Sequence, residues 1–295
     1  MYKNNISVIV TTYNGAKYIE KQIDSILKQT LLPQEIIICD DNSKDGTAAI
    51  LKNYENNDKI KILINDLQLG VVANFKKAAS LAREGNYIAF ADQDDIWVAD
   101  KLQILADELA LIDDVEKPAL VFSDLTVIDK NDEIVAASFW DKQQIQPERV
   151  NLERMLFGNI ITGCTIMINN AMKLEFLNMD NYSFLHDEWM ALIAYSFGNV
   201  SFIKDKLVLY RQHESNVTYA ENIKPQSKWG KFKDDIDYAL KRKPFLKHQF
   251  ALANFFFSQY HSKFNNNQLV VFKSFIQLEK KSYFAQRIKR RNTHL

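Results

Sequence analysis

The first third of the chain alternates between two spacings of apolar residues. Short runs rich in Val and Ile predict buried strands at residues 6–11, 35–39, 60–64 and 87–91. Between them, apolar side chains recur at helical spacing and predict helices over 16–29, 47–54 and 71–83. Strands and amphipathic helices in this order predict a mostly parallel α/β sheet with right-handed crossovers.

The rest of the chain is more mixed in pattern. A helix is expected from Asp95, as its N-cap, to about residue 111. Further strands are expected at 119–123, within 158–169, at 200–203 and at 206–210, with a hairpin formed by 125–128 and 133–136. Further helices are expected at 150–157, 184–197, 232–242, 245–260 and 269–290.

Composition narrows the class of protein. The 295 residues are 47% hydrophobic and 12% aromatic, enough for a large core. The two cysteines, Cys39 and Cys164, lie in apolar surroundings without metal-ligand spacing, so we expect buried free thiols in a reducing compartment. A strand pattern begins within six residues, and no apolar run approaches the roughly 20 residues of a membrane span, so we expect a cytoplasmic protein.

Charge divides the chain unevenly although the net charge is zero. Residues 224–295 contain sixteen Lys and Arg but four Asp and Glu, which leaves +12, and residues 1–223 therefore carry −12. We expect a main domain over 1–223, whose chemistry the motifs below specify, and a basic helical region over 224–295 that meets an anionic surface.

Polar residues gather directly after the predicted strands. Thr11, Tyr13 and Asn14 follow the first strand, and Asp40 and Asp41 end the second. The fourth strand ends in Asp92, Asp94 and Asp95. Ligands of open α/β sheets bind beyond the carboxyl ends of strands, so one crevice can collect all of these groups.

The acid cluster needs a counter-charge. Three carboxylates within four positions repel one another unless a cation or hydrogen-bond donors lie nearby. They therefore predict a divalent metal that carries a phosphorylated ligand, and the alternative is an acidic turn that caps a helix. The first turn has no G-x-G-x-x-G, and the chain has no G-x-x-x-x-G-K-[ST] loop, which disfavours a dinucleotide-binding or P-loop protein.

Five motifs, in this order, resemble those of the inverting glycosyltransferases of family 2. They are residues 10–15 (VTTYNG), 40–47 (DDNSKDGT), 92–97 (DQDDIW), 186–187 (HD) and 210–213 (YRQH), and they span about residues 5–215. The resemblance is strongest to the rhamnosyltransferase-like bacterial members that build surface polysaccharides. It implies the A-type glycosyltransferase fold, a Rossmann-like mostly parallel sheet with flanking helices, here with a C-terminal helical appendage.

The resemblance also implies roles for individual residues. Thr11, Tyr13, Asn14, Asp41, Asn74 and Asp92 would bind the nucleotide, with Asp92 near the ribose. Asp94 and His213 would hold Mg²⁺ or Mn²⁺ on the diphosphate. Asp187 would be the catalytic base, although Glu188 stands where the family usually has an aromatic residue.

The chemistry of sugar transfer requires the same kinds of residue. A metal stabilises the charge that grows on the leaving diphosphate. On the opposite face of the sugar, a carboxylate deprotonates the attacking acceptor hydroxyl, as in an inverting glycosidase with the hydroxyl in place of water.

Several of these residues can instead have purely structural roles. His213 can be a hydrogen-bonded structural residue, and Asn74 can cap its own helix. Asp187 and Glu188 can complement a helix dipole. The whole chain can be an inactive sugar-nucleotide-binding protein or a nucleotidyltransferase.

The expected activity is metal-dependent transfer of rhamnose from dTDP-rhamnose, or of a hexose from a UDP-sugar. The acceptor would be a glycan or a lipid-linked oligosaccharide in the synthesis of capsule, O-antigen, lipopolysaccharide or cell wall.

The basic C-terminal region can have either of two functions. Lys and Arg interleaved with aromatic residues are typical of helices that bind an anionic membrane surface, here the inner face of the cell membrane. A helical cover or a homodimer contact is the alternative. We expect no nucleic-acid partner, because no nucleic-acid-binding motif accompanies the charge.

Overall fold

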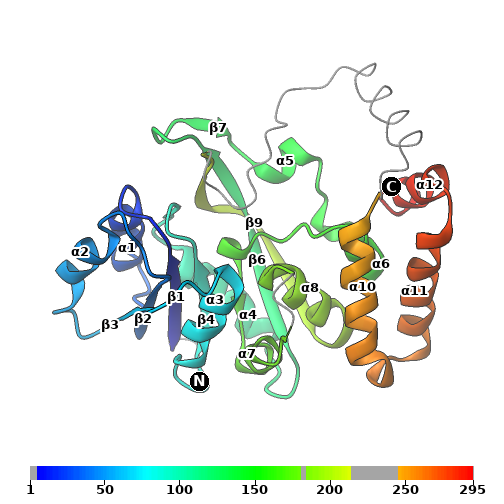
Figure 1. Ribbon diagram of the computed structural model, residues 1–295, viewed down its shortest axis with the longest axis horizontal. Coiled ribbons are helices and arrows are strands. Elements are labelled where there is room, and N and C mark those ends of the chain that lie inside the picture. Colours follow the sequence, from blue (N-terminus) through cyan, green and yellow to red (C-terminus); the bar gives the residue numbers. More distant parts are fainter. Residues whose placement is uncertain (1–4, 181–183, 214–244, 295) are drawn as a thin grey trace. The chain divides into compact units, whose positions relative to one another are not determined.

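The computed structural model describes residues 5–180, 184–213 and 245–294 (Figure 1). These residues form two compact units. One comprises the chain up to Pro147 together with Ile161–His213, and the other comprises Glu148–Ile160 together with the described C-terminal residues. The domain boundary expected between residues 223 and 224 lies outside the described residues.

The first unit is built on one sheet with the strand order β3–β2–β1–β4–β8–β6–β9–β5, and β7 pairs with β6. β1 pairs in parallel with β2 and β4, β2 with β3, and β6 with β9, whereas the short β8 is antiparallel to β4 and β6. The strands are β1 (Ile6–Thr12), β2 (Glu35–Asp40), β3 (Ile60–Ile64), β4 (Tyr87–Ala91), β5 (Ile96–Trp97), β6 (Ala119–Ile128), β7 (Ile134–Ala136), β8 (Met167–Ile168) and β9 (Asn199–Arg211). The expected mostly parallel sheet is confirmed.

Helices flank this sheet because each buries one apolar stripe against it. α3 packs on β1 and β2, and α4 packs on β6 and β9. Every residue of β1, β2 and β4 is buried, as expected for central strands covered on both faces. The helices of this unit are α1 (Ile19–Leu27), α2 (Thr47–Leu51), α3 (Val71–Ser80), α4 (Lys101–Ile112), α5 (Phe139–Gln143), α7 (Asn170–Leu177) and α8 (His186–Phe197).

The expected helix start at Asp95 is wrong. Ile96 and Trp97 form β5, which pairs antiparallel with β9, and α4 begins only at Lys101. The Asp95 carboxylate accepts a hydrogen bond from the backbone N–H of Arg211 at 3.0 Å instead of capping a helix. A strand pairing distant in sequence therefore takes the place of the local capping motif.

Four other elements also differ from expectation. The two strands expected at 200–203 and 206–210 are one strand, β9, whose polar residues 204–206 are exposed. The strand expected at 119–123 continues through 128 as β6. α5 and α7 were not expected, and the helix expected over 232–242 lies outside the described residues.

The second unit gathers helices from two parts of the chain. α6 (Leu152–Leu156) packs with α10 (Lys247–Tyr260), α11 (Asn266–Gln277) and α12 (Tyr283–His294), and α10 and α11 lie side by side (Figure 1). Its core is aromatic: the ring of Phe275 lies 4.9 Å from that of Phe157 and 5.0 Å from that of Phe250. The ion pair between Lys289 and Glu153, at 2.6 Å, joins α12 to the α6 segment.

The single helix expected over 269–290 is wrong, because the chain turns between α11 and α12. Lys281 is extended there, and the side-chain amide of Gln286 donates to the carbonyl oxygens of Leu278 at 2.9 Å and Lys281 at 3.1 Å. These bonds tie the first turn of α12 to the turn that precedes it. No helix within the described ranges is long and apolar enough to cross a membrane.

Glu35 fastens the amino ends of the strands in the first unit. Its carboxylate is 2% exposed and accepts hydrogen bonds from Ser7 Oγ at 2.6 Å, Lys61 Nζ at 2.6 Å and the backbone N–H of Arg83 at 2.7 Å. Burial acts to raise the pKa of Glu35, but the bonds from Lys61, Ser7 and Arg83 together hold it below the ordinary 4.5. β1, β2, β3 and the end of α3 thus share one anchor.

We expect Glu35→Gln to lower the free energy of unfolding at pH 7 by about 1–3 kcal/mol, because charge-assisted hydrogen bonds to a buried carboxylate are lost. A carboxylate with a lowered pKa stabilises the fold above its unfolded-state pKa and loses this effect as pH falls through the folded-state value. The difference between wild type and Glu35→Gln in urea denaturation should therefore shrink below about pH 4.5. Glu20→Gln on the exposed face of α1 is the control, and a difference that stays constant from pH 7 to pH 3 would contradict this role.

Candidate active site

The turn after β1 is fastened to the acid turn by Gln93. Gln93 Oε1 accepts from Thr12 Oγ1 and from the backbone N–H of Tyr13, both at 2.7 Å, and its Nε2 donates to the Tyr13 carbonyl at 3.1 Å. Thr11 is 8% exposed, whereas the Tyr13 side chain is 41% exposed. The ring of Tyr13 is therefore accessible to a ligand while its backbone is held in place.

Asn14 shapes the loop after β2. Its backbone N–H donates to Ser43 Oγ at 2.8 Å, and its Oδ1 accepts from the backbone N–H of Lys44 at 2.8 Å. Ser43 Oγ in turn donates to Asp40 Oδ1 at 2.5 Å. Asn14 adopts a left-handed conformation (φ 52°), which asparagine tolerates better than most residues.

Asp41 and Asn74 lie in one buried polar network. Asp41 is 3% exposed and accepts from the backbone N–H groups of Leu69 and Gly70, at 2.7 and 2.8 Å, and from Asn65 Nδ2 at 2.9 Å. Asn74 is 1% exposed, accepts from Asn65 at 2.9 Å and donates to the Cys39 carbonyl at 2.8 Å. Both side chains thus join the end of β2 to α3 and the loop before it.

The acid turn brings together the two predicted metal ligands. His213 Nε2 lies 2.8 Å from Asp94 Oδ2, although the residues are 119 positions apart. The two side chains are 14% and 9% exposed. The structure therefore places Asp94 and His213 side by side at the edge of the sheet.

This pair fits a divalent metal. Mg²⁺ or Mn²⁺ with ligand distances of about 2.1 Å places neighbouring ligand atoms about 3 Å apart, close to the separation of Oδ2 and Nε2. One carboxylate and one imidazole leave room for diphosphate oxygens and water, as expected of a metal that is bound partly by substrate.

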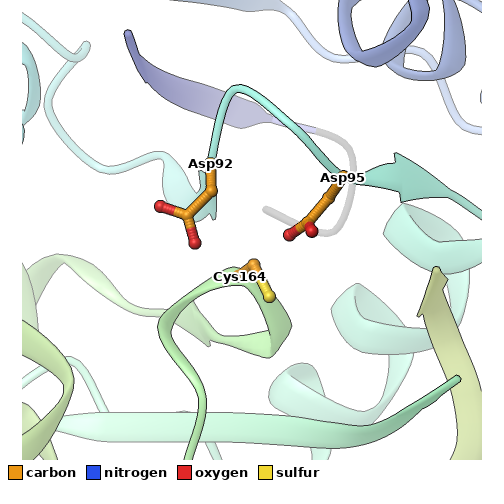
Figure 2. A group of neighbouring side chains, drawn as sticks. All are labelled: Asp92, Asp95 and Cys164. Atoms are coloured by element: carbon orange, nitrogen blue, oxygen red, sulfur yellow. The ribbon is translucent and has the colours of Figure 1, made fainter. Parts of the chain in front are cut away.

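A second acidic group lies in the same turn, and Figure 2 shows its side chains pointing toward one another. The carboxyl groups of Asp92 and Asp95 and the thiol of Cys164 have ligand atoms within 4.8 Å of each other. Burial is the main cause that raises the pKa of Asp95 and of Cys164 well above their ordinary values, and neighbouring acids add to it. Protonated groups of this kind are poor metal ligands.

The cation next to this second acidic group is Lys101. Lys101 is fully buried, its Nζ donates to the Cys164 carbonyl at 2.5 Å and lies 3.4 Å from the centroid of the Trp97 ring. Burial lowers the pKa of Lys101 to about 7, against the opposing fields of Cys164, Asp95 and Asp92. A metal here would share the pocket with this ammonium group, so the Asp94–His213 pair is the better metal site. Cys39 and Cys164 are both free and buried, as the sequence predicts.

Arg211 holds the acid turn from β9. Its side chain is buried, and Nε donates to the Asp94 carbonyl at 2.7 Å. A second guanidinium nitrogen donates to the Asp129 carbonyl at 3.0 Å and pairs with the Asp132 carboxylate. The ring of Tyr18 lies 4.6 Å from the Arg211 guanidinium and stacks on the His213 imidazole at 5.2 Å. The orientation of His213 thus depends on the same cluster.

Asp187 lies in the first turn of α8. Its Oδ1 accepts from the backbone N–H of Glu188 at 2.7 Å, and the backbone N–H of Gly163 also bonds to its carboxylate. Burial first, then Glu188 and Asp92, raise the pKa of Asp187 to about 7. The Glu188 side chain turns back to accept from the Leu185 N–H at 3.3 Å. Asp187, rather than Glu188, therefore lies in the electrostatic field of the acid turn.

Gln93, Lys101 and Arg211 were not singled out from the sequence. A signal existed for Lys101, because it lies one helical turn before Leu105 on the apolar face of α4. Arg211 follows the apolar residues of β9 directly, but nothing local shows that it would be buried.

The chain resembles known proteins over most of its length. The model of the family described as "Glycosyl transferase family 2" matches residues 7–172. The Escherichia coli UDP-Glc:alpha-D-GlcNAc-diphosphoundecaprenol beta-1,3-glucosyltransferase WfgD is 26% identical over 245 residues, which cover 80% of this chain and 88% of WfgD. The putative teichuronic acid biosynthesis glycosyltransferase TuaG of Bacillus subtilis is 31% identical over 202 residues, covering 66% of this chain and 75% of TuaG.

Solved structures support the fold. S. aureus TarS 1–349, determined with UDP-GlcNAc, matches with a TM-score of 0.58 at 19% identity and covers 98% of this chain and 89% of that one. The same TarS fragment with UDP matches with a TM-score of 0.53 at 22% identity and covers 70% and 60% of the two chains. The A-type glycosyltransferase fold is confirmed, and with a family model matched over more than half its length the chain belongs to glycosyl transferase family 2.

Proposed function

We propose that this glycosyltransferase moves a sugar with inversion from a pyrimidine nucleoside diphosphate onto an acceptor hydroxyl in the synthesis of a surface polysaccharide. The observation that carries the proposal is the pairing of Asp94 with His213 at the carboxyl ends of the strands, with the half-buried Asp187 nearby. A UDP-hexose is the favoured donor over dTDP-rhamnose, because the name of WfgD specifies UDP-Glc.

The nucleotide would lie across the ends of β1 and β2. The exposed ring of Tyr13 offers a face for the base, and Thr11 lies beside it on β1. Asp92, at the end of β4, would contact the ribose, whereas Asp41, Asn74 and Asn14 are already bonded within the protein and would shape the pocket.

Asp187 would act as the base. Its carboxylate removes the proton of the acceptor hydroxyl as that oxygen attacks the anomeric carbon, and the bond to the diphosphate breaks on the opposite face. The Glu188 and Gly163 N–H groups hold the carboxylate in one orientation. A Mg²⁺ or Mn²⁺ ion held by Asp94 and His213 would neutralise charge on the leaving diphosphate.

The acceptor would be a glycan, in free or lipid-linked form. The name of WfgD specifies a sugar on diphosphoundecaprenol, and TuaG is named for teichuronic acid biosynthesis. A lipid-linked acceptor requires an enzyme that works at a membrane surface, on the cytoplasmic side where nucleotide sugars are made.

α12 has the surface that such an enzyme would need. Phe284 and Ile288 are 58% and 61% exposed and lie one helical turn apart. Arg287 and Arg291 are exposed close by. Apolar side chains flanked by arginines suit the interface of an anionic bilayer.

The catalytic role of Asp187 predicts a specific loss. We expect Asp187→Asn to lower kcat for sugar transfer by about 10²–10⁴-fold, because a carboxamide cannot take the acceptor proton. The affinity for UDP with Mn²⁺ should stay within about twofold. Wild-type kcat/KM should rise with pH up to about 7, since the base works only when ionised.

Glu188→Gln is the matched control and should keep transfer within about threefold, because that side chain bonds to the Leu185 backbone. Full transfer by Asp187→Asn, measured as release of nucleoside diphosphate together with glycosylated product, would remove Asp187 from the mechanism. A loss confined to Glu188→Gln would move the role of base to Glu188.

The membrane role predicts that Phe284→Gln with Ile288→Gln weakens sedimentation with phosphatidylglycerol-containing vesicles by about tenfold, or ~1.4 kcal/mol. Point variants are preferable to truncation, because removal of the C-terminal helices would strip α6 of its partners. Leu67→Gln with Leu111→Gln, two exposed sites of the first unit, should bind vesicles normally. Unchanged vesicle binding by the α12 variant would contradict the proposal, and a shift from dimer to monomer would show that this face is a homodimer contact.

A further inference from the structure

His186, the first residue of α8, is an aromatic side chain inside an aromatic cluster. It is 6% exposed, and its ring centroid lies 4.4 Å from that of Phe75, 5.5 Å from Phe90 and 6.2 Å from Phe176. These three phenylalanines come from α3, β4 and α7. A phenylalanine would suit this environment at least as well as an imidazole.

The imidazole lacks hydrogen-bond partners in this cluster. Among the described residues, no protein group accepts from or donates to either Nδ1 or Nε2 of His186. Buried polar side chains nearly always have hydrogen-bond partners, because an unpartnered one costs free energy of folding. Burial lowers the pKa of His186 to about 4, so at neutral pH one ring nitrogen can donate and the other can accept.

The ring nitrogen Nε2 of His186 lies close to the candidate base. A Cβ atom built on Gly163 would lie 2.7 Å from His186 Nε2 and 3.8 Å from the Cβ of Asp187. The same Gly163 donates its backbone N–H to the Asp187 carboxylate. The absence of a side chain at Gly163 thus lets the buried Nε2 and Asp187 lie on either side of the same backbone position.

We propose that His186 is a sugar-recognition residue, whose ring nitrogen hydrogen-bonds a hydroxyl of the transferred sugar next to Asp187. This inference rests on the proposed function. The sugar must lie near Asp187, because the acceptor oxygen meets both the base and the anomeric carbon. A sugar hydroxyl donates and accepts, which matches a neutral imidazole, whereas a diphosphate would favour a cation.

The test compares the affinity of the full-length protein for a nucleotide sugar with that for the matching nucleoside diphosphate, in Mn²⁺. UDP-glucose, UDP-GlcNAc and dTDP-rhamnose, with UDP and dTDP, are the probes for calorimetry. His186→Phe should keep the affinity for the nucleoside diphosphate within about twofold. It should reduce the added affinity due to the sugar by about tenfold, which corresponds to ~1.4 kcal/mol.

Stability gives an independent readout. His186→Phe should leave Tm unchanged or raise it by about 2–4 °C, because two unpartnered nitrogens leave an aromatic pocket. His186→Asn, which keeps a donor and an acceptor but loses the ring contacts, should be less stable than His186→Phe and yet retain more of the sugar's added affinity. Phe176→Leu, on the far side of the ring, should lose stability and keep sugar affinity.

Other outcomes distinguish a failure of this inference from a failure of the proposed function. If His186→Phe retains the whole difference between nucleotide sugar and nucleoside diphosphate, the inference is overturned while the proposed function stands. If His186→Phe lowers Tm and both affinities together, His186 is a packing residue and the inference is also overturned. If the wild type binds none of the nucleotides, the proposed function fails and this inference falls with it.

Discussion

The buried guanidinium of Arg211 is the interaction on which the site depends. It bonds to the Asp94 carbonyl, to the Asp129 carbonyl and to the Asp132 carboxylate, while the Arg211 backbone N–H bonds to Asp95. One residue at the end of β9 therefore fixes the acid turn and the β6–β7 turn. Because His213 follows two positions later, the same anchor delivers the imidazole to Asp94.

A second buried cation divides the acid turn into two parts. Lys101 is buried within electrostatic reach of Asp92 and Asp95 and bonds to the Cys164 carbonyl, so it partly offsets the charge of these acids. Asp94 instead pairs with His213, whose side chain is 14% exposed. The three neighbouring acids are therefore unequal: Asp95 bonds to the Arg211 backbone, Asp92 lies beside Asp95 and Cys164, and Asp94 pairs with His213, where a metal and its diphosphate would bind.

Sequence patterns predicted what local physics determines. Runs of Val and Ile that end in polar residues located β1, β2 and β4 and the groups at their carboxyl ends, and family resemblance brought in His213 and Asp187. The start of α4 was mispredicted because Asp95 resembles an N-cap until β5 pairs with β9, more than 100 residues later. Contacts between distant segments also determine three other features, and no local pattern contains them. These are the burial of Lys101, the burial of Arg211 and the packing of α6 with the C-terminal helices.

The central claim is that Asp94 and His213 hold a nucleotide diphosphate through a divalent cation. Its most direct test is the thermal stability of wild type and Asp94→Asn with UDP, in Mn²⁺ and in EDTA. A ligand at about 100 times its Kd stabilises the fold by about 2.7 kcal/mol, or roughly 5–10 °C for a domain of this size. The account predicts that increase only for wild type in Mn²⁺, and an equal increase in EDTA or in Asp94→Asn would contradict it.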